Sequence, residues 1–436
     1  MTWWKTFKDP ELERLIESAR NENLDLKMVG LRIDQARAEQ SANRGALYPK
    51  ISGVGDVARV SNLLPFNIPQ GGANPTATTN SFNYFLSGFD AVWEIDLFGR
   101  LRHKLEASKA ETQASAEEYR EAMMLISAEI GRDYSRYRGL QNQRDLLLER
   151  HRLLQQTEKL IENRVENGLE PLDRLARAKA QSETIQGELR SVEGGITTSR
   201  QDIEKLTGKK PNALLMRLTE TRDIPMSDER RLLTQPADTL RLRPDIRSAE
   251  LQLQAATSRQ GAAIAELFPK ISIAAFLGIR NTDLENLFRS SSFAWASGSS
   301  ISQPIFNFGQ IRAGIDLAEA RQREAYFDYE KTVLEALHEC ESTLIEFLKE
   351  EKRKEDLERS TSALHQAANM AEARYRGGLG TLQDALSAQI SANEERARLI
   401  ESRVLLAQKL IAVYKAIGGG GQSPIRIEEE PLRPWG

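Results

Sequence analysis

Residues 46–52 read Ala-Leu-Tyr-Pro-Lys-Ile-Ser, and residues 266–272 read Glu-Leu-Phe-Pro-Lys-Ile-Ser, so the same motif returns after 220 positions. Residues 96–100, Asp-Leu-Phe-Gly-Arg, return at 306–310 as Phe-Asn-Phe-Gly-Gln, and here the offset is 210. The offset changes at residues 63–79, an extra segment of the first copy that is rich in Pro, Gly and Asn. The chain is therefore an internal duplication, and its fold is expected to repeat.

The duplication predicts how the chain is organised. We expect a first repeat over residues 1–220, a second over 221–417 and a flexible tail over 418–436. The first repeat is predicted to contain a helix, strands at about 50–62 and 81–96, a long helix at about 100–163 and a helix at about 171–207. The second is predicted to contain a helix at about 243–267, strands at about 270–281 and 293–305, a long helix at about 310–376 and a helix at about 380–417.

The two long helices are predicted from a narrow apolar stripe. No proline interrupts residues 76–170 or 305–423. Apolar side chains recur there every three or four positions, as in a coiled coil, and each position is apolar again 210 residues later. The pairs are Tyr119 and Tyr329, Met123 and Val333, Ile126 and Ala336, Ile130 and Cys340, Tyr134 and Leu344, and Tyr137 and Phe347. A helix over 100–163 is about 96 Å long, which suits a rod or the wall of a tube.

The predicted strands alternate apolar and polar residues. Ile271, Ile273, Ala275, Leu277 and Ile279 alternate with more polar or smaller residues, and residues 89–96 follow a similar pattern. This pattern is typical of a strand with lipid on one side and water on the other, although the edge of a soluble sandwich alternates in the same way. Four strands are too few to close a barrel, and exposed edges invite pairing with other copies. Two copies would give eight strands and three would give twelve.

Composition excludes several classes of function. Sixty Lys plus Arg against 63 Asp plus Glu gives a net charge of −3, so nucleic acid is not an expected partner. No run of 18 apolar residues predicts a transmembrane helix. The single cysteine, Cys340, lies in the apolar stripe and is predicted to be a small core residue, and the four histidines are scattered. The sequence lacks G-x-S-x-G, H-E-x-x-H and Walker A motifs, so we expect no enzyme, no metal site and no cofactor.

Several motifs together resemble one family. Residues 3–12 (Trp-Trp-Lys-Thr-Phe-Lys-Asp-Pro-Glu-Leu), 48–51 (Tyr-Pro-Lys-Ile) and 93–100 (Trp-Glu-Ile-Asp-Leu-Phe-Gly-Arg) are similar to the outer membrane efflux proteins, the TolC-like family. Residues 242–246 (Leu-Arg-Pro-Asp-Ile) and 303–309 (Gln-Pro-Ile-Phe-Asn-Phe-Gly) extend the resemblance over roughly 3–417. The nearest likeness is to the NodT-type branch that serves resistance-nodulation-division (RND) pumps.

The resemblance implies a fold, a location and partners. The fold would be mainly α with a membrane β-barrel: a homotrimer whose twelve-stranded barrel, four strands per chain, continues as a long α-helical barrel. The protein would lie in the outer membrane of a Gram-negative bacterium, in contact with outer-membrane lipid, with its helices in the periplasm. It would conduct drugs or other small toxic compounds from an inner-membrane pump, of the RND type, through a periplasmic adaptor to the exterior.

Many NodT-type members carry a lipid on an N-terminal cysteine. No cysteine precedes Cys340, and residues 1–5 show no apolar segment of an export signal. We expect a processed or engineered N-terminus, and lipidation is not indicated by the sequence. The alternative to an efflux duct is a soluble coiled-coil scaffold with a small β cap.

Two helix tips are candidate docking sites. Residues 168–171 (Gly-Leu-Glu-Pro) and 377–380 (Gly-Gly-Leu-Gly) are breakers that reverse a helical hairpin, and a purely structural role would account for the glycines. By resemblance, the tips form the periplasmic entrance and contact the adaptor. The residues that match this pattern are Arg164, Gly168, Leu169, Arg374, Gly378 and Leu379.

The resemblance also places a gate near the second tip. Asp384 lies where the family has a gate aspartate, and a ring of such carboxylates can select cations; a solvated surface carboxylate is the alternative. Arg174 occupies the equivalent position in the first hairpin, next to Asp173, and we expect this pair to tether the entrance closed, with Tyr375 as a further partner. Ser387 and Gly380 depart from the family pattern, which leaves the mechanism of closure open.

Overall fold

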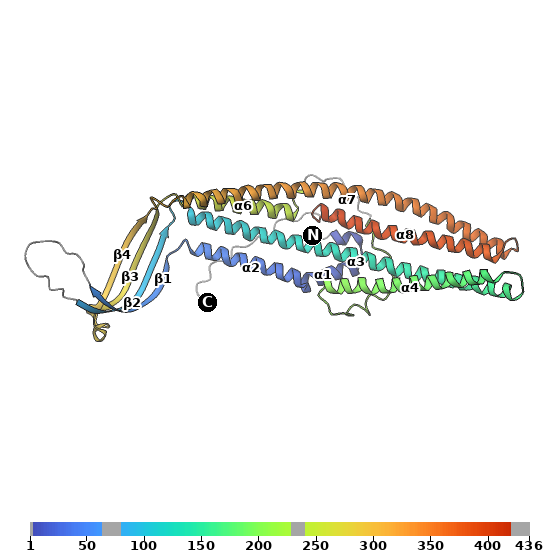
Figure 1. Ribbon diagram of the computed structural model, residues 1–436, viewed down its shortest axis with the longest axis horizontal. Helices are drawn as coiled ribbons and strands as arrows, with labels where there is room; N and C mark the ends of the chain where they lie inside the picture. Colours follow the sequence, from blue (N-terminus) through green and yellow to red (C-terminus); the bar gives the residue numbers. More distant parts are fainter. Residues whose placement is uncertain (1–2, 63–79, 228–239, 420–436) are drawn as a thin grey trace, which may run out of the picture. The chain divides into compact units, whose positions relative to one another are not determined.

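The computed structural model describes residues 3–62, 80–227 and 240–419 (Figure 1). The extra segment at 63–79 lies outside the described residues, as does the predicted tail beyond residue 419. The described residues divide into two compact units. We call them the helical unit (3–33, 114–250 and 328–419) and the sheet unit (34–113 and 251–327). Each unit contains corresponding parts of both repeats, because the long helices begin in one unit and end in the other.

The helical unit is built around two antiparallel hairpins, one from α3 and α4 and the other from α7 and α8 (Figure 1). Its elements are η1 (Trp3–Phe7), α1 (Pro10–Glu22), α3 (Arg100–Glu166), α4 (Leu172–Leu206), α7 (Gln310–Arg376) and α8 (Leu382–Ala416). Helices α2 (Leu24–Gly45) and α6 (Pro244–Ala265) also contribute residues to both units.

The core of the helical unit includes residues of α3 and α8. Ile130, Tyr134 and Tyr137 from the predicted stripe are buried there, together with Ile411 and Tyr414 of α8. These are apolar positions of a coiled-coil seam, so their burial confirms the sequence pattern. Burying such side chains is worth about 2 kcal/mol each against leaving them in water.

Two further contacts belong to this core. The indole of Trp3 in η1 stacks on the ring of Tyr414, with centroids 5.7 Å apart, so the first described residues pack against the end of α8. Cys340 of α7 packs half-buried against the same core, and its thiol donates a hydrogen bond to the carbonyl of Ala416 at 3.0 Å. Burial raises the pKa of the Cys340 thiol, which fits the predicted core role.

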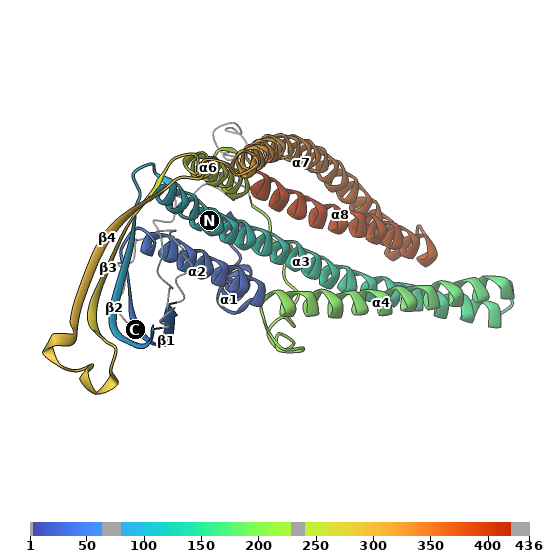
Figure 2. The same ribbon diagram turned by 60° about the vertical axis from the view of Figure 1, so that its left-hand side comes forward.

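The sheet unit contains one antiparallel sheet in the order β1-β2-β3-β4 (Figure 2). The strands are β1 (Lys50–Asn62), β2 (Asn80–Ile95), β3 (Lys270–Asn281) and β4 (Phe293–Ser302), and short 3-10 turns lie between β3 and β4 at Leu284–Asn286 and Ser290–Ser292. β4 ends at Ser302, short of the predicted residue 305, because Pro304 has no N–H for a ladder. β1 and β4 form the two edges.

The register of the strands gives the sheet one apolar face. Phe89 lies opposite Leu277, and Leu277 lies opposite Trp295. Because opposite residues point to the same side, alternate positions of all four strands share this face. Its larger side chains, each at least 36% exposed, are Ile51, Val57, Phe89, Trp93, Ile273, Leu277, Phe293, Trp295 and Ile301. The other face carries six charged residues, Lys50, Asp56, Asp90, Glu94, Lys270 and Arg280, while Arg59, near the end of β1, lies on the apolar face.

Candidate functional site

The first predicted tip is a tight helix end. Gly168 has a φ of 68°, a left-handed conformation that glycine adopts without strain. Its N–H donates to the carbonyl of Val165 at 3.0 Å, and the N–H of Leu169 donates to the carbonyl of Arg164 at 2.8 Å. This pair of hydrogen bonds is the Schellman arrangement, which satisfies carbonyls left open at the end of a helix. The side chain of Arg164 lies 3.6 Å from a carboxylate oxygen of Glu170.

The second tip repeats this geometry. Gly378 has a φ of 73°, its N–H donates to the carbonyl of Tyr375 at 3.0 Å, and the N–H of Leu379 donates to the carbonyl of Arg374 at 2.8 Å. The duplication therefore extends to the hydrogen bonds that end α3 and α7.

Each tip presents a leucine to solvent. Leu169 is 67% exposed and Leu379 is 83% exposed. In a Schellman end this position usually packs against an apolar residue five positions earlier, but Arg164 and Arg374 stand there. The leucines therefore contribute little to the folding of the single chain, and their apolar surface is available to a partner.

Asp384 caps the first turn of α8. Its carboxylate accepts a hydrogen bond from the hydroxyl of Thr381 at 2.6 Å, and the Thr381 hydroxyl in turn accepts one from the Asp384 N–H at 3.1 Å. The backbone N–H of Thr381 also donates to this carboxylate, at 3.4 Å, and completes a capping box. The hydroxyl and backbone N–H of Thr381, with a smaller contribution from the charge of Arg374, hold the pKa of the exposed Asp384 carboxyl below its usual range. Asp384 is therefore ionised at neutral pH.

The candidate tether residues make contacts within the first hairpin. Arg174 lies 3.3 Å from the carboxylate of Glu170, and Asp173 lies 3.3 Å from the guanidinium of Arg177. Tyr375 is 40% exposed. Within the described part of the chain, no hydrogen bond or ion pair links Asp173 or Arg174 to the second hairpin.

Two ion pairs that the sequence did not indicate join the hairpins. Arg150 of α3 contacts Glu394 of α8 at 2.6 Å, and Arg396 of α8 lies 3.8 Å from Glu149 of α3. Each helix supplies one acid and one base to these two ion pairs. Such pairs connect positions more than 200 residues apart, so no local pattern could have identified them.

A buried arginine ties three further elements together. Arg243, which stands just before α6, is 4% exposed and donates to the carbonyl of Ala416 at 2.6 Å. It also donates to the carboxylates of Asp245 and Glu339, at 2.7 and 2.8 Å. Burial by itself would lower the pKa of Arg243, but these carboxylates raise it above the usual value. Residues 242–246 are part of the family resemblance, but the resemblance assigns no role to Arg243.

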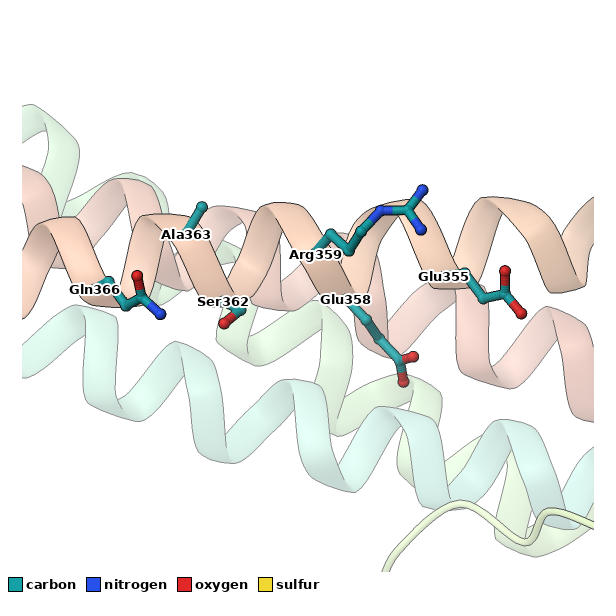
Figure 3. Close-up of a pocket in the computed structure, with 6 residues that line it drawn as sticks. All are labelled: Glu355, Glu358, Arg359, Ser362, Ala363 and Gln366. Atoms are coloured by element: carbon teal, nitrogen blue, oxygen red, sulfur yellow. The ribbon is translucent and has the colours of Figure 1, made fainter.

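A shallow hollow on the surface of α7 is not a convincing small-molecule site. Figure 3 shows a hollow of about 560 Å³ on α7, lined by Glu355, Glu358, Arg359, Ser362, Ala363 and Gln366. All six lie on one helix, and their side chains point in different directions, so they do not surround a ligand. No cluster of acidic, histidine or cysteine side chains in the described ranges could hold a metal ion. None of the described helices is both long and apolar enough to cross a bilayer.

The sequence profile of the outer membrane efflux protein family matches residues 15–209 and 236–419. These ranges cover most of both repeats, and the chain belongs to this family. It is an efflux protein of the outer membrane, and the family consists of channel and efflux proteins, which are not enzymes.

Relatives and solved structures agree with this assignment. The cation efflux system protein CusC of Escherichia coli K12 is 28% identical over 423 residues, which cover 96% of this chain and 88% of CusC. The solvent efflux pump outer membrane protein SrpC of Pseudomonas putida is also 28% identical, over 95% of this chain and 86% of its own. The solved outer-membrane channel OprN superposes with a TM-score of 0.87 at 29% identity, covering 96% of this chain and 92% of OprN. The predicted TolC-like fold is confirmed, and the soluble scaffold is not favoured.

Proposed function

We propose that three copies of the chain form an efflux duct that carries drugs or other small toxic compounds across the outer membrane. The observation that carries this proposal is the four-stranded sheet, which has an exposed apolar face and two edges. A sheet of this kind is unfavourable in water, because its apolar side chains stay hydrated and its edge N–H and C=O groups lack partners. A barrel in a bilayer removes both costs.

The faces of the sheet fit that arrangement. With the apolar face toward lipid, Trp295 and Phe89 contact hydrocarbon or headgroups, and the acidic and basic residues of the opposite face line a water-filled bore. Three copies give twelve strands, the number implied by the resemblance. The α-helices would then continue the bore into the periplasm.

The tips are the proposed docking sites for a periplasmic adaptor. Leu169 and Leu379 are exposed in identical turns, so a trimer would present six copies of one small apolar feature at the end of the helices. Arg164 and Arg374, with Gly168 and Gly378, frame these leucines. An inner-membrane pump of the RND type is the proposed source of energy.

Asp384 is proposed as the gate residue, together with Asp173, Arg174 and Tyr375. A symmetric trimer would place three Asp384 carboxylates at one level. Because the capping box keeps each of them ionised at neutral pH, such a ring would favour cations over anions. The names of the relatives mention cation and solvent efflux, and this chain has only seven Met and four His. We therefore propose amphiphilic organic compounds as substrates in preference to soft metal ions.

An efflux assay tests the function and the docking sites together. Cells that lack the gene are complemented with the wild type, Leu169→Asp or Leu379→Asp, and accumulation of ethidium is followed by fluorescence. We expect the wild type to lower accumulation and each tip variant to lose most of that effect at equal outer-membrane abundance. Leu284→Asp is the matched control, because Leu284 is 59% exposed and far from the tips in sequence. If the wild type does not lower accumulation of ethidium or of other amphiphiles, the proposed function is wrong.

Reversal potentials in planar bilayers test the gate. Under a salt gradient, Asp384→Asn should lower the ratio of cation to anion permeability several-fold, while Asp356→Asn, which removes an exposed carboxylate of α7, should leave it unchanged. An unchanged ratio for Asp384→Asn would reject the gate assignment without affecting the fold.

A further inference from the structure

The strand pairs within the chain have the same register once the repeat is applied. Lys50 of β1 lies opposite Val92 of β2. Adding 220 to the first number and 210 to the second gives Lys270 and Ser302, which lie opposite each other in β3 and β4. The offsets taken from the sequence motifs therefore reproduce the observed ladder without adjustment. The duplication is accurate to the residue within the sheet.

The pairing between β2 and β3 is the third ladder of the chain, and it has an aromatic contact at its helical end. Phe89 of β2 lies opposite Leu277 of β3. Phe98, which follows β2, stacks on Phe268, which precedes β3, with centroids 4.8 Å apart and planes 12° apart. An offset stack of this kind is worth roughly 1 kcal/mol beyond its buried area.

The repeat equivalents of this contact lie at opposite edges of the sheet. Phe98 corresponds to Phe308, which follows β4, and Phe268 corresponds to Tyr48, which precedes β1. Phe308 is 91% exposed and Tyr48 is 58% exposed, whereas Phe98 and Phe268 are 40% and 44% exposed. Within one chain the two edges are separated by three strand spacings, about 14 Å. Among the rings of the described residues, Phe308 contacts only its neighbour Phe306, edge to face, with centroids 4.5 Å apart, so one side of its ring stays open. Tyr48 and Phe308 are therefore the repeat equivalents of a stack that the chain makes once between Phe268 and Phe98.

We infer that each boundary between protomers copies the β2–β3 pairing of the single chain. Phe89 lies opposite Leu277 within the chain. Adding 210 to the first number and subtracting 220 from the second places Ser299 of one protomer opposite Val57 of the partner subunit. The same operation on Ala91 and Ala275 places Ile301 opposite Gly55 of the partner subunit. Phe308 then stacks on Tyr48 of the partner subunit. This inference rests on the proposed trimer and fixes its boundary residue by residue.

The faces of the sheet agree with this register. Residues of the apolar face meet residues of the apolar face, so the lipid-facing surface continues across the boundary, whereas a slip by one residue would turn β4 to the wrong side. Side-chain sizes also match, because each larger residue lies opposite a small one. Ile301 lies opposite Gly55 of the partner subunit, and Ser299 lies opposite Val57 of the partner subunit. The ionic part of the β2–β3 junction, in which Arg100 lies 3.6 Å from Glu266, is not repeated, because Gln310 and Ala46 stand at the equivalent positions. The aromatic stack is the part that recurs.

Disulfide trapping tests the register. In a Cys340→Ser background, Ser299→Cys is combined with Val57→Cys, and the matched control combines Ser299→Cys with Gly53→Cys, four residues away and about 13 Å along the strand. A disulfide needs Cα atoms within about 7 Å, so neither pair can close within one chain. Membranes are oxidised mildly, and the products are separated by non-reducing SDS–PAGE.

We expect a covalent trimer from Ser299→Cys with Val57→Cys and only monomers from the control. A trimer from the control pair alone, or no cross-link from either pair in a protein that still forms trimers and pores, would overturn the inferred register while leaving the efflux duct intact. Failure to form any trimer would instead overturn the proposed function.

A double-mutant cycle tests the stack. Tyr48→Ala and Phe308→Ala are each expected to lower the temperature at which the trimer dissociates, and the double variant should dissociate no earlier than the more affected single variant, because the first truncation already removes the contact. Phe288→Ala, which truncates another exposed phenylalanine, is the control and should add its effect independently. If the decreases in dissociation temperature caused by Tyr48→Ala and Phe308→Ala simply add in the double variant, the two rings do not contact each other.

Discussion

The buried guanidinium of Arg243 holds three helices of the helical unit together. Arg243 binds the last carbonyl of α8 through Ala416, the first turn of α6 through Asp245 and the middle of α7 through Glu339. Burying a charge is costly unless every donor finds a partner, and here the partners come from three elements. Burial by itself would raise the pKa of the Glu339 carboxyl, but hydrogen bonds from Arg243 and Lys415 lower it below its usual range. We regard this residue as a positioning group for the helix ends.

Replacing Arg243 by alanine should therefore strongly destabilise the protein. Arg243→Ala leaves the Glu339 and Asp245 carboxylates and the Ala416 carbonyl without this donor, and we expect a loss of about 3 kcal/mol. Arg241→Ala, two positions earlier and exposed, should change stability by less than about 0.5 kcal/mol. Thermal unfolding followed by circular dichroism measures both. Equal melting temperatures for the two variants would contradict the positioning role.

The capping box of α8 makes a prediction about pH. A carboxyl with a lowered folded pKa, such as Asp384, adds stability that is present above its unfolded pKa and is lost as the pH falls through the folded value. After correction for intrinsic rates, hydrogen exchange of the first turn of α8 should be equal at pH 7 and pH 5. Thr381→Ala should speed exchange there about fivefold, and Thr381→Ser, which keeps the hydroxyl, should not. Slower exchange at pH 5 than at pH 7 would contradict the lowered pKa.

At the scale of elements, α3 and α8 approach closely at one glycine. A Cβ built on Gly139 of α3 would lie 2.1 Å from a methyl of Val404 of α8. Gly139→Ala should therefore force the helices apart and destabilise the protein by roughly 1–3 kcal/mol. Adding Val404→Ala should recover part of that loss, because it removes the obstructing methyl groups.

Gly187→Ala provides the matched control for this packing. Gly187 lies in the interior of α4, and a Cβ there meets nothing within 4 Å. The substitution should stabilise the helix by about 0.5–1 kcal/mol. Chemical or thermal unfolding of the variants measures the differences. A Gly139→Ala protein as stable as the wild type would mean that α3 and α8 do not pack as described.

The helices were predictable to within a few residues, and the differences have local causes. The long helix predicted over 100–163 ends at Glu166, because the turn that closes it is set by Gly168. The first repeat begins with two helices where one was expected. Asn23 separates them: its side chain caps α2 by accepting from the Leu26 N–H at 2.9 Å and donates to the carbonyl of Leu206 at 2.8 Å. The partner at Leu206 could not be read from nearby sequence.

The candidate sites were predictable to a different degree. The tip turns follow from glycine positions, so the sequence locates Gly168 and Gly378 well. Contacts between distant segments follow only from packing, which is why the pairing of Arg150 with Glu394 was missed. The roles of Asp384 and Arg174 depend on other protomers, and these roles stay predictions.

At the scale of the whole molecule, the single chain leaves its sheet incomplete. An apolar face and two strand edges stay exposed in one copy, while the helical unit already has its own core. Association should therefore involve the sheet, where water-exposed apolar side chains lie beside unpaired backbone groups of the edge strands. The internal repeat offers a ready pattern for the association, because β1 and β4 are equivalents of strands that already pair within the chain.

Single-channel recording from the purified protein in planar lipid bilayers tests most directly whether copies of this chain enclose a water-filled bore. We predict discrete current steps of uniform size with a preference for cations over anions. Protein that is helical by circular dichroism and inserted in the bilayer, yet never produces such steps, would contradict the account.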